Sequence, residues 1–176
     1  MRPKKDKLYV GITDTEWMNF IRKKNNTNEL GKEINFWTPG STQFKVLEPG
    51  ELFLFKMHDR QGNPDENGEI VGGGYFVDFQ QMTISEAWKR FGYGNGCASE
   101  TELFIKIRNY QEKKGIEISD TIGCIILSNI FILPREKWIK SPSDFSKAVV
   151  RGKSYETSEG IGKELMEAIK RCLLNR

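Results

Sequence analysis

Two short segments of the sequence combine residue types that suit the binding of a flat ring. Residues 35–40 have the sequence NFWTPG, so Trp37 stands at the end of a predicted strand beside a turn. Residues 70–76 have the sequence IVGGGYF, in which three glycines interrupt a strand pattern. Glycine within a strand often marks close approach of another group to the backbone. An aromatic wall opposite bare backbone offers a base a stacking face and amide groups for its edges. A barrel-closing bend at the glycines, with Trp37 in the core, explains the same residues.

Several catalytic and cofactor-binding motifs are absent from the sequence, which restricts the reactions that the protein could catalyse. His58 is the only histidine. Zinc-finger sites, Ser-His-Asp triads and two-histidine nuclease centres all use histidine. Each of them would need residues that this sequence does not have, or would have to use His58 alone. The sequence has no P-loop, and its three consecutive glycines do not have the G-x-G-x-x-G spacing of a dinucleotide site. We therefore expect no catalytic residue, no metal and no cofactor.

Composition indicates a cytoplasmic protein with a moderate surface charge. The 176 residues carry a formal net charge of +3, which permits nucleic-acid binding without requiring it. The three cysteines are odd in number and form no C-x-x-C pair, which favours a reducing compartment. No apolar run is long enough for a membrane span or a signal peptide. Basic side chains that could contact phosphate cluster at residues 2–7, 22–24, 89–90, 113–114 and 151–153.

Short strands and amphipathic helices must position these residues. Alternating or buried apolar patterns predict strands at residues 8–13, 34–37, 51–57, 70–79 and 123–131, the last one extending to 138. Helical spacing predicts helices after Asp14, near residues 84–91, after Ser99 with Leu103, Phe104, Ile107 and Tyr110 inward, and at 160–174. Residues 59–69 and 141–159 are predicted to be irregular. We expect one α+β domain over 1–176, in which a mixed sheet of about six strands curls into a small barrel flanked by helices.

Several short strings resemble, in order, the landmarks of one bacterial module. They are YVGITDTEW at 9–17, NFW at 35–37, PGELFLFK at 49–56, IVGGGYF at 70–76, SEAWKRFG at 85–92 followed by Asn95-Gly96, IGC at 122–124 and GKSY at 152–155. The module is the SRA-like, PUA-superfamily domain found ahead of HNH nuclease domains in modification-dependent restriction endonucleases. The resemblance covers about residues 8–155 and extends more loosely to EVE and YTH domains.

The resemblance implies that the chain is a recognition module and not itself an enzyme. Members of this superfamily flip a modified base into a pocket lined by aromatic side chains. The expected partner is modified double-stranded DNA, with an HNH nuclease, fused or separate, as a second partner. The sequence ends at Arg176 with no HNH domain, so we expect the chain to act as the specificity module of a restriction or defence system. The resemblance does not identify the modification.

Carried over residue by residue, the resemblance implies two groups of contacts. The base pocket would comprise Thr13, Asp14, Asn35, Trp37, Lys56, His58, Gly73, Gly74 and Tyr75. Contacts with the DNA backbone or groove would come from Asn95, Arg151, Lys153 and Tyr155. Asp14 could accept a hydrogen bond from an exocyclic amine of the base, or could instead cap the helix that follows it.

Two other functions are compatible with the same sequence. The first is an RNA-binding module of the YTH or PUA kind, which affinity for single-stranded RNA would distinguish from a DNA reader. The second is a small PUA-like hydrolase acting on a modified nucleoside, with Lys56 and an acidic neighbour as catalysts. The acidic pair of Asp65 and Glu66 lies in a predicted loop and is typical of solvated surface.

Overall fold

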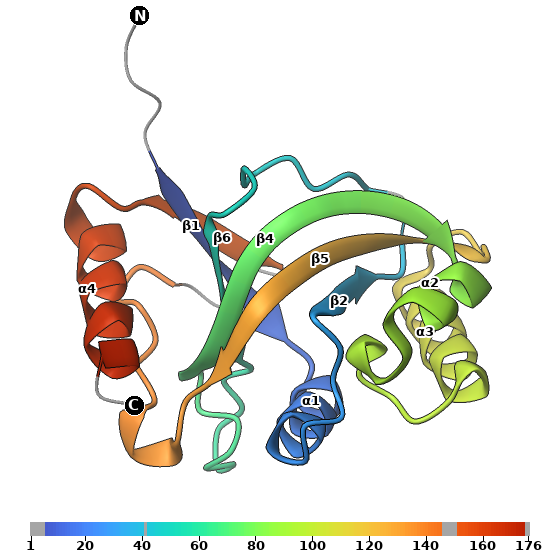
Figure 1. Ribbon diagram of the computed structural model, residues 1–176, viewed down its shortest axis with the longest axis horizontal. Coiled ribbons are helices and arrows are strands. Elements are labelled where there is room, and N and C mark those ends of the chain that lie inside the picture. The colour runs from blue at the N-terminus through green and yellow to red at the C-terminus, as the bar shows by residue number, and fades with distance from the viewer. Residues whose placement is uncertain (1–5, 41, 146–150, 175–176) are drawn as a thin grey trace, which may run out of the picture. The chain divides into compact units, whose positions relative to one another are not determined.

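The computed structural model describes residues 6–40, 42–145 and 151–174 (Figure 1). Six strands in this part of the chain are hydrogen-bonded in the order β2-β5-β4-β3-β1-β6. The strands are β1 (Lys7–Thr13), β2 (Glu33–Thr38), β3 (Leu52–Met57), β4 (Ile70–Thr83), β5 (Thr121–Ile132) and β6 (Gly152–Glu156). The helices are α1 (Thr15–Asn26), α2 (Ile84–Phe91), α3 (Glu100–Lys114) and α4 (Gly160–Leu174), with 3₁₀ turns η1 (Gly92–Asn95) and η2 (Arg135–Lys137).

The sheet is mixed because β1 and β3 are parallel neighbours. In contrast, β1 with β6, β2 with β5, and β3 with β4 pair antiparallel. The expected class, an α+β protein with a mixed sheet of about six strands and flanking helices, is confirmed. Parallel pairing brings the carboxyl ends of β1 and β3 to the same edge.

Contacts within the chain group into two compact units, each with its own core. The first unit comprises the described residues within 1–15, 50–75 and 130–176, and the second those within 16–49 and 76–129. Strands β4 and β5 contribute residues to both units. The expectation of a single domain over 1–176 stays a prediction.

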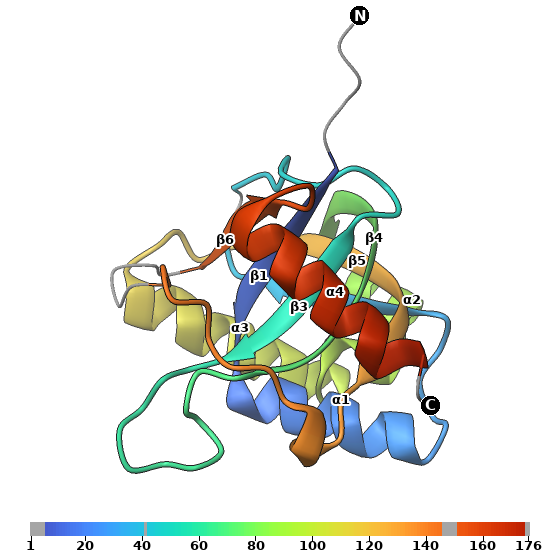
Figure 2. The same cartoon turned by 90° about the vertical axis from the view of Figure 1, so that its left-hand side faces the viewer.

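The core of the first unit lies between the sheet and α4. Leu8 of β1 and Leu54 of β3 pack in one buried cluster with Leu165 and Ile169 of α4. Figure 2 shows α4 lying across β1 and β3. The predicted amphipathic helix at 160–174 is therefore confirmed, and its apolar face is explained by this packing.

The core of the second unit joins α2, α3 and β5, and Figure 1 shows α2 and α3 side by side. The predicted Ser99 cap is confirmed, because its side chain accepts a hydrogen bond from the Glu102 backbone N–H at 3.1 Å. The predicted inward position of Phe104 is wrong, since its side chain is 42% exposed. The buried side of α3 instead carries Leu103, Ile107 and Gln111, which recur every four residues.

Two elements differ from the sequence prediction, β6 and β5. A strand, β6, lies within the stretch 141–159 that was predicted to be irregular, and it pairs with β1. Strand β5 ends at Ile132 and does not reach residue 138, as expected when Pro134, which lacks an amide hydrogen, follows. Helix α2 is capped by Thr83, whose hydroxyl accepts from the Glu86 backbone N–H at 3.1 Å.

None of the helices described is both long and apolar enough to cross a membrane.

Candidate functional site

Several predicted pocket residues meet where the parallel strands β1 and β3 end, in the first unit. The strand register places Thr13 opposite Met57. Polar residues on either side of this pair, together with a buried glutamate of the 59–69 loop, form a polar group at this edge. We call this group the strand-end cluster, and its members are Asp14, Thr15, Lys56, His58 and Glu66.

Lys56 is the most unusual member, because its side chain is only 4% exposed. Its Nζ donates to the backbone oxygen of Met57 at 3.3 Å and lies 4.6 Å from the ring centre of Phe145. A Cβ on Gly68 would lie 3.3 Å from Nζ, so this glycine leaves room for the ammonium. Among the described residues no carboxylate oxygen lies within 4.0 Å of Nζ. Burial lowers the pKa of Lys56, and the nearby charge of Asp59 opposes this shift only in part.

A buried ammonium with so little compensation favours an incoming negative or carbonyl-bearing group. Desolvation of a charge is costly unless hydrogen bonds or an opposite charge offset it. A phosphate or a base carbonyl that reached Nζ would form a charge-assisted hydrogen bond. The site around Lys56 is therefore suited to a polar ligand.

His58 adds a half-buried imidazole to the strand-end cluster. Burial lowers its pKa first, and the charge of Arg60 lowers it further. The carboxylates of Glu66 and Asp14 act in the opposite direction without reversing the shift. The ring is thus neutral at pH 7 and can donate through one nitrogen and accept through the other.

Glu66 is held inside the cluster and is not a solvated surface residue. Glu66 is only 6% exposed, and its Oε1 accepts a hydrogen bond from the Thr15 hydroxyl at 2.8 Å. Arg60 Nη1 lies 3.1 Å from Oε2 but outside hydrogen-bond geometry. The prediction of solvated surface is wrong for Glu66 and holds for Asp65, which is exposed and pairs with Arg135 at 2.7 Å. Nothing local in the sequence distinguishes these two acidic neighbours.

Thr13 and Asp14 end β1, as the sequence indicated. Thr13 is fully buried, and its hydroxyl donates to the Gly11 backbone oxygen at 3.1 Å. Asp14 is half-buried and directly precedes α1. This position is compatible with both predicted roles, acceptor for a base amine and cap of the helix.

The glycine stretch of β4 is packed against its neighbours. A Cβ on Gly73 would lie 2.6 Å from the Phe53 backbone oxygen and 2.8 Å from Cζ of Phe131. Gly74 is buried opposite Phe53, and the ring of Tyr75 lies 6.4 Å from that of Phe131. The space that was expected to admit a base is therefore occupied at Gly73 by Phe131. Close packing of strands is the physical reason for this glycine.

In the second unit, Asn35 and Trp37 belong to a polar network that links β2 to η1. Asn35 is fully buried, and its Nδ2 donates to Asn95 Oδ1 at 2.9 Å. The Trp37 indole N–H donates to the Asn95 backbone oxygen at 2.9 Å, while its half-buried ring meets Tyr110 edge-on at 5.7 Å. Asn95 itself is 1% exposed and donates to the backbone oxygens of Ala87 and Gly92. The structure thus places Asn95 inside the unit, whereas the sequence hypothesis placed it in a nucleic-acid groove.

The predicted backbone contacts at residues 151–155 lie in or next to β6. Lys153 Nζ lies 2.6 Å from Asp144 Oδ2, and the Tyr155 hydroxyl donates to Asp144 Oδ1 at 2.7 Å. Burial, followed by the hydrogen bond to Asp144, raises the pKa of Tyr155, so its phenol stays protonated. Arg151 is exposed. The segment therefore presents one exposed guanidinium and one ammonium whose charge Asp144 partly balances.

No three His, Cys, Asp or Glu side chains of the described ranges are grouped so that they could hold a metal ion.

Comparisons with known proteins bear on the fold. No family model matches the sequence, and no curated protein matches it. Among solved structures, the crystal structure of ASCH from Zymomonas mobilis has a TM-score of 0.54 at 12% identity, covering 93% of this chain and 94% of that one. A tyrosine-to-phenylalanine mutant of that protein has a TM-score of 0.53 at 12% identity, covering 91% and 96%. The chain thus shares its fold with these ASCH structures.

Proposed function

We propose that this protein is a nucleic-acid-binding module that recognises a modified base in duplex DNA. The observation that carries the proposal is the buried ammonium of Lys56, which has no carboxylate within 4.0 Å among the described residues. A phosphate oxygen or a base carbonyl is the kind of group that such a cation binds. The neutral ring of His58, in the same cluster, supplies a donor and an acceptor for a base edge.

The choice of modified DNA rests on the sequence resemblance to SRA-like modules. Flipping a base out of a duplex costs a few kcal/mol, and stacking on aromatic side chains returns about 1–3 kcal/mol per base. A modified base is selected when the pocket complements its added group. In this proposal the chain supplies specificity in a restriction or defence system, and a separate or fused nuclease supplies cleavage.

A panel of nucleic acids tests this function directly. Fluorescence anisotropy would compare duplexes containing 5-methylcytosine, 5-hydroxymethylcytosine or N6-methyladenine with the unmodified duplex and with single-stranded RNA. We expect one modified duplex to bind at least about tenfold more tightly than the others, which corresponds to about 1.4 kcal/mol. Equal affinity for all duplexes, or tighter binding of RNA, would contradict modified-DNA recognition. The same samples incubated with magnesium should stay uncut, and cleavage that depends on an acidic residue of this chain would contradict a pure binding role.

A second candidate function, hydrolysis of a modified nucleoside, is favoured by the lowered pKa of Lys56. A lysine with a lowered pKa can act as a base or nucleophile, and Asp59 is its acidic neighbour. Turnover of acylated or methylated nucleosides, followed by chromatography, separates this activity from binding. Product formation that disappears in the Lys56→Met variant would establish the hydrolase in place of the reader.

A further inference from the structure

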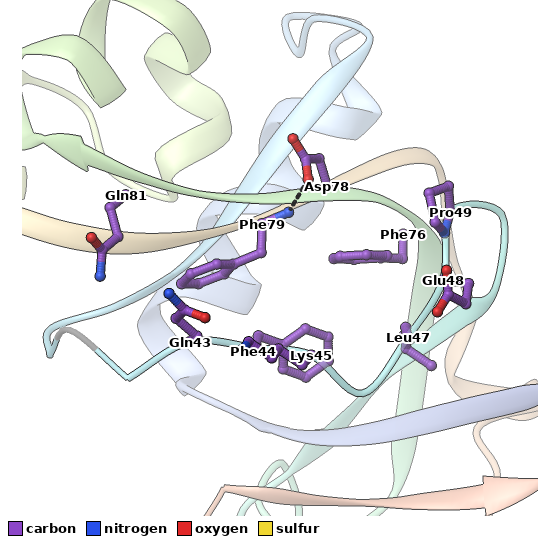
Figure 3. Close-up of a pocket in the computed structure, with 10 residues that line it drawn as sticks. All are labelled: Gln43, Phe44, Lys45, Leu47, Glu48, Pro49, Phe76, Asp78, Phe79 and Gln81. Carbon is purple, nitrogen blue, oxygen red and sulfur yellow. Dashed lines mark hydrogen bonds between the residues drawn. The ribbon is translucent and has the colours of Figure 1, made fainter.

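A second candidate binding site lies wholly within the second unit, at a hollow between residues 43–49 and β4 (Figure 3). Its volume is about 500 Å³, within the range of ligand pockets. Three phenylalanines and several polar side chains line it, among them Phe44, Phe76, Phe79, Gln43, Lys45 and Asp78. None of these residues belongs to the strand-end cluster or to the base pocket predicted from the sequence.

The aromatic side chains give the hollow faces on which a flat ring can stack. Figure 3 shows the rings of Phe76 and Phe79 projecting from β4 toward the 43–49 segment. Phe76 is 6% exposed and its ring centre lies 5.6 Å from that of Phe44, at an interplanar angle of 58°. Phe44 and Phe79 are only half-buried, so part of each ring is accessible to a ligand. A base stacked on such rings gains binding energy through its π face whatever its sequence context.

Packing behind the hollow holds the Phe79 ring in place. A Cβ on Gly123 would lie 3.0 Å from Cζ of Phe79, so the absence of a side chain at this position of β5 lets the ring lie against the strand. A ring fixed in this way is preorganised and loses little entropy when a ligand stacks on it.

The rim of the hollow provides hydrogen-bonding groups for the edge of a base. Asp78 is exposed; its two oxygens accept from the Phe79 backbone N–H at 2.8 Å and from Gln80 Nε2 at 2.9 Å. A carboxylate has about four acceptor positions, so it can accept further hydrogen bonds. The Gln43 amide is exposed and makes no hydrogen bond with any described residue.

The charges at the hollow disfavour phosphate. Glu48 and Asp78 contribute two negative charges, and Lys45 contributes one positive charge. A phosphate would be repelled by the Asp78 carboxylate, whereas an exocyclic amine could donate to it. The rim therefore favours the base of a nucleotide over its phosphate.

We propose that this hollow binds an unpaired nucleobase that carries an exocyclic amine, which adenine, cytosine and guanine do. The base would stack on the phenylalanines, and its amine would donate a hydrogen bond to Asp78. The site is separate from the strand-end cluster and does not depend on the function proposed for that cluster. Because stacking and one edge contact are its only attractions, we expect a free nucleoside to bind with a dissociation constant of about 1–10 mM.

Amide chemical-shift mapping of the complete chain tests this proposal with free nucleosides as probes. Adenosine and cytidine should shift the amides of residues 43–48 and 76–81, and inosine and uridine should shift them severalfold less at equal concentration. Ribose 5-phosphate should leave these amides unchanged. No shift there with adenosine or cytidine at about 10 mM, equal shifts with ribose 5-phosphate, or shifts confined to the strand-end cluster would overturn the proposal.

Single substitutions provide a second test of nucleobase binding at the hollow. Phe79→Leu keeps an apolar side chain but removes a stacking face, and we expect it to weaken adenosine binding about fivefold or more. Phe104→Leu changes a 42% exposed phenylalanine of α3, outside the hollow, and should leave binding unchanged. Asp78→Asn, on the exposed rim, should remove the preference for adenosine over inosine even if Phe79→Leu does not fold. Unchanged affinity in folded Phe79→Leu, or unchanged preference in Asp78→Asn, would overturn the assignment. None of these measurements uses a polynucleotide, so the result is distinguishable from failure of the proposed DNA binding.

Discussion

The ammonium of Lys56 lies 4.6 Å from the ring centre of Phe145, a position of favourable cation–π contact in an environment that leaves Lys56 only 4% exposed. Such a contact compensates only part of the desolvation of a charge. The buried ammonium of Lys56 therefore lowers the stability of the folded protein. Residues that reduce stability in this way are common in binding sites.

Replacement of Lys56 by methionine should therefore raise stability at neutral pH. Burial lowers the pKa of Lys56 below its ordinary 10.5, so the unfolded chain binds this proton more tightly than the folded protein does. Stability of the wild type should rise as the pH increases from the folded pKa toward 10.5, because the neutral amine costs less to bury. The Lys56→Met variant should lose this rise. Urea unfolding at pH 7 and pH 10 measures both effects, and a variant that is less stable than wild type at pH 7 would show that Lys56 is a structural cation.

Asn95 should be important for stability and not for nucleic-acid contact. Its side-chain amide donates to two backbone oxygens and its Oδ1 accepts from Asn35. Asn95→Ala removes three hydrogen bonds among buried groups and should cost at least about 2 kcal/mol of unfolding free energy. Affinity for DNA, measured on the folded fraction, should not change. A variant of normal stability with impaired binding would return Asn95 to the groove.

Trp37 can be tested for two roles in one sample. Its ring packs against the buried cluster of the second unit, and its indole N–H donates to Asn95. Trp37→Ala should therefore lower the unfolding free energy by about 3 kcal/mol. If Trp37 also stacks on a flipped base, the ratio of modified to unmodified affinity falls as well, by about 1–3 kcal/mol. Thermal melting together with the two affinities separates these effects; an unaltered melting temperature would show that the packing role is wrong.

The ion pair between Lys153 and Asp144 provides two substitutions with opposite expected effects. Lys153→Ala should weaken binding to modified and unmodified DNA alike and reduce the salt slope by about 0.9, as expected for one lost phosphate contact. Asp144→Asn removes the carboxylate that partly balances the ammonium at 2.6 Å, so it should strengthen binding to both duplexes. Lys163→Ala, at an exposed position of α4, is the matched control and should change neither quantity. A change in discrimination between the duplexes would contradict a phosphate role for Lys153.

Local patterns predicted most of the elements, and tertiary contacts explain the exceptions. Apolar periodicity located the helix at 160–174, and a single serine located the start of α3, because both signals act within a few residues. Strand β6 has no buried residue, and its pairing is supplied by β1, roughly 145 positions earlier in the chain. The residues of β6 alone therefore do not indicate that it pairs with β1.

The candidate site was predicted less completely than the fold, for the same physical reason. The ends of β1 and β3 were recognised, but Glu66 is buried and accepts a hydrogen bond from Thr15, which lies 51 positions away. The glycines of β4 were correctly judged unusual, but the group that approaches Gly73 is Phe131. The hollow at Phe79 was missed because its other wall comes from residues 43–49, which have no regular structure of their own.

The binding role of Lys56 is tested most directly by comparing the affinities of wild type and Lys56→Met for modified and unmodified duplexes of the same sequence. We expect wild type to bind the modified duplex more tightly, and Lys56→Met to lose at least about tenfold of this affinity while remaining folded. Lys163→Met should bind as wild type does. Equal affinities of wild type and folded Lys56→Met for the modified duplex would show that the buried ammonium has no part in binding nucleic acid.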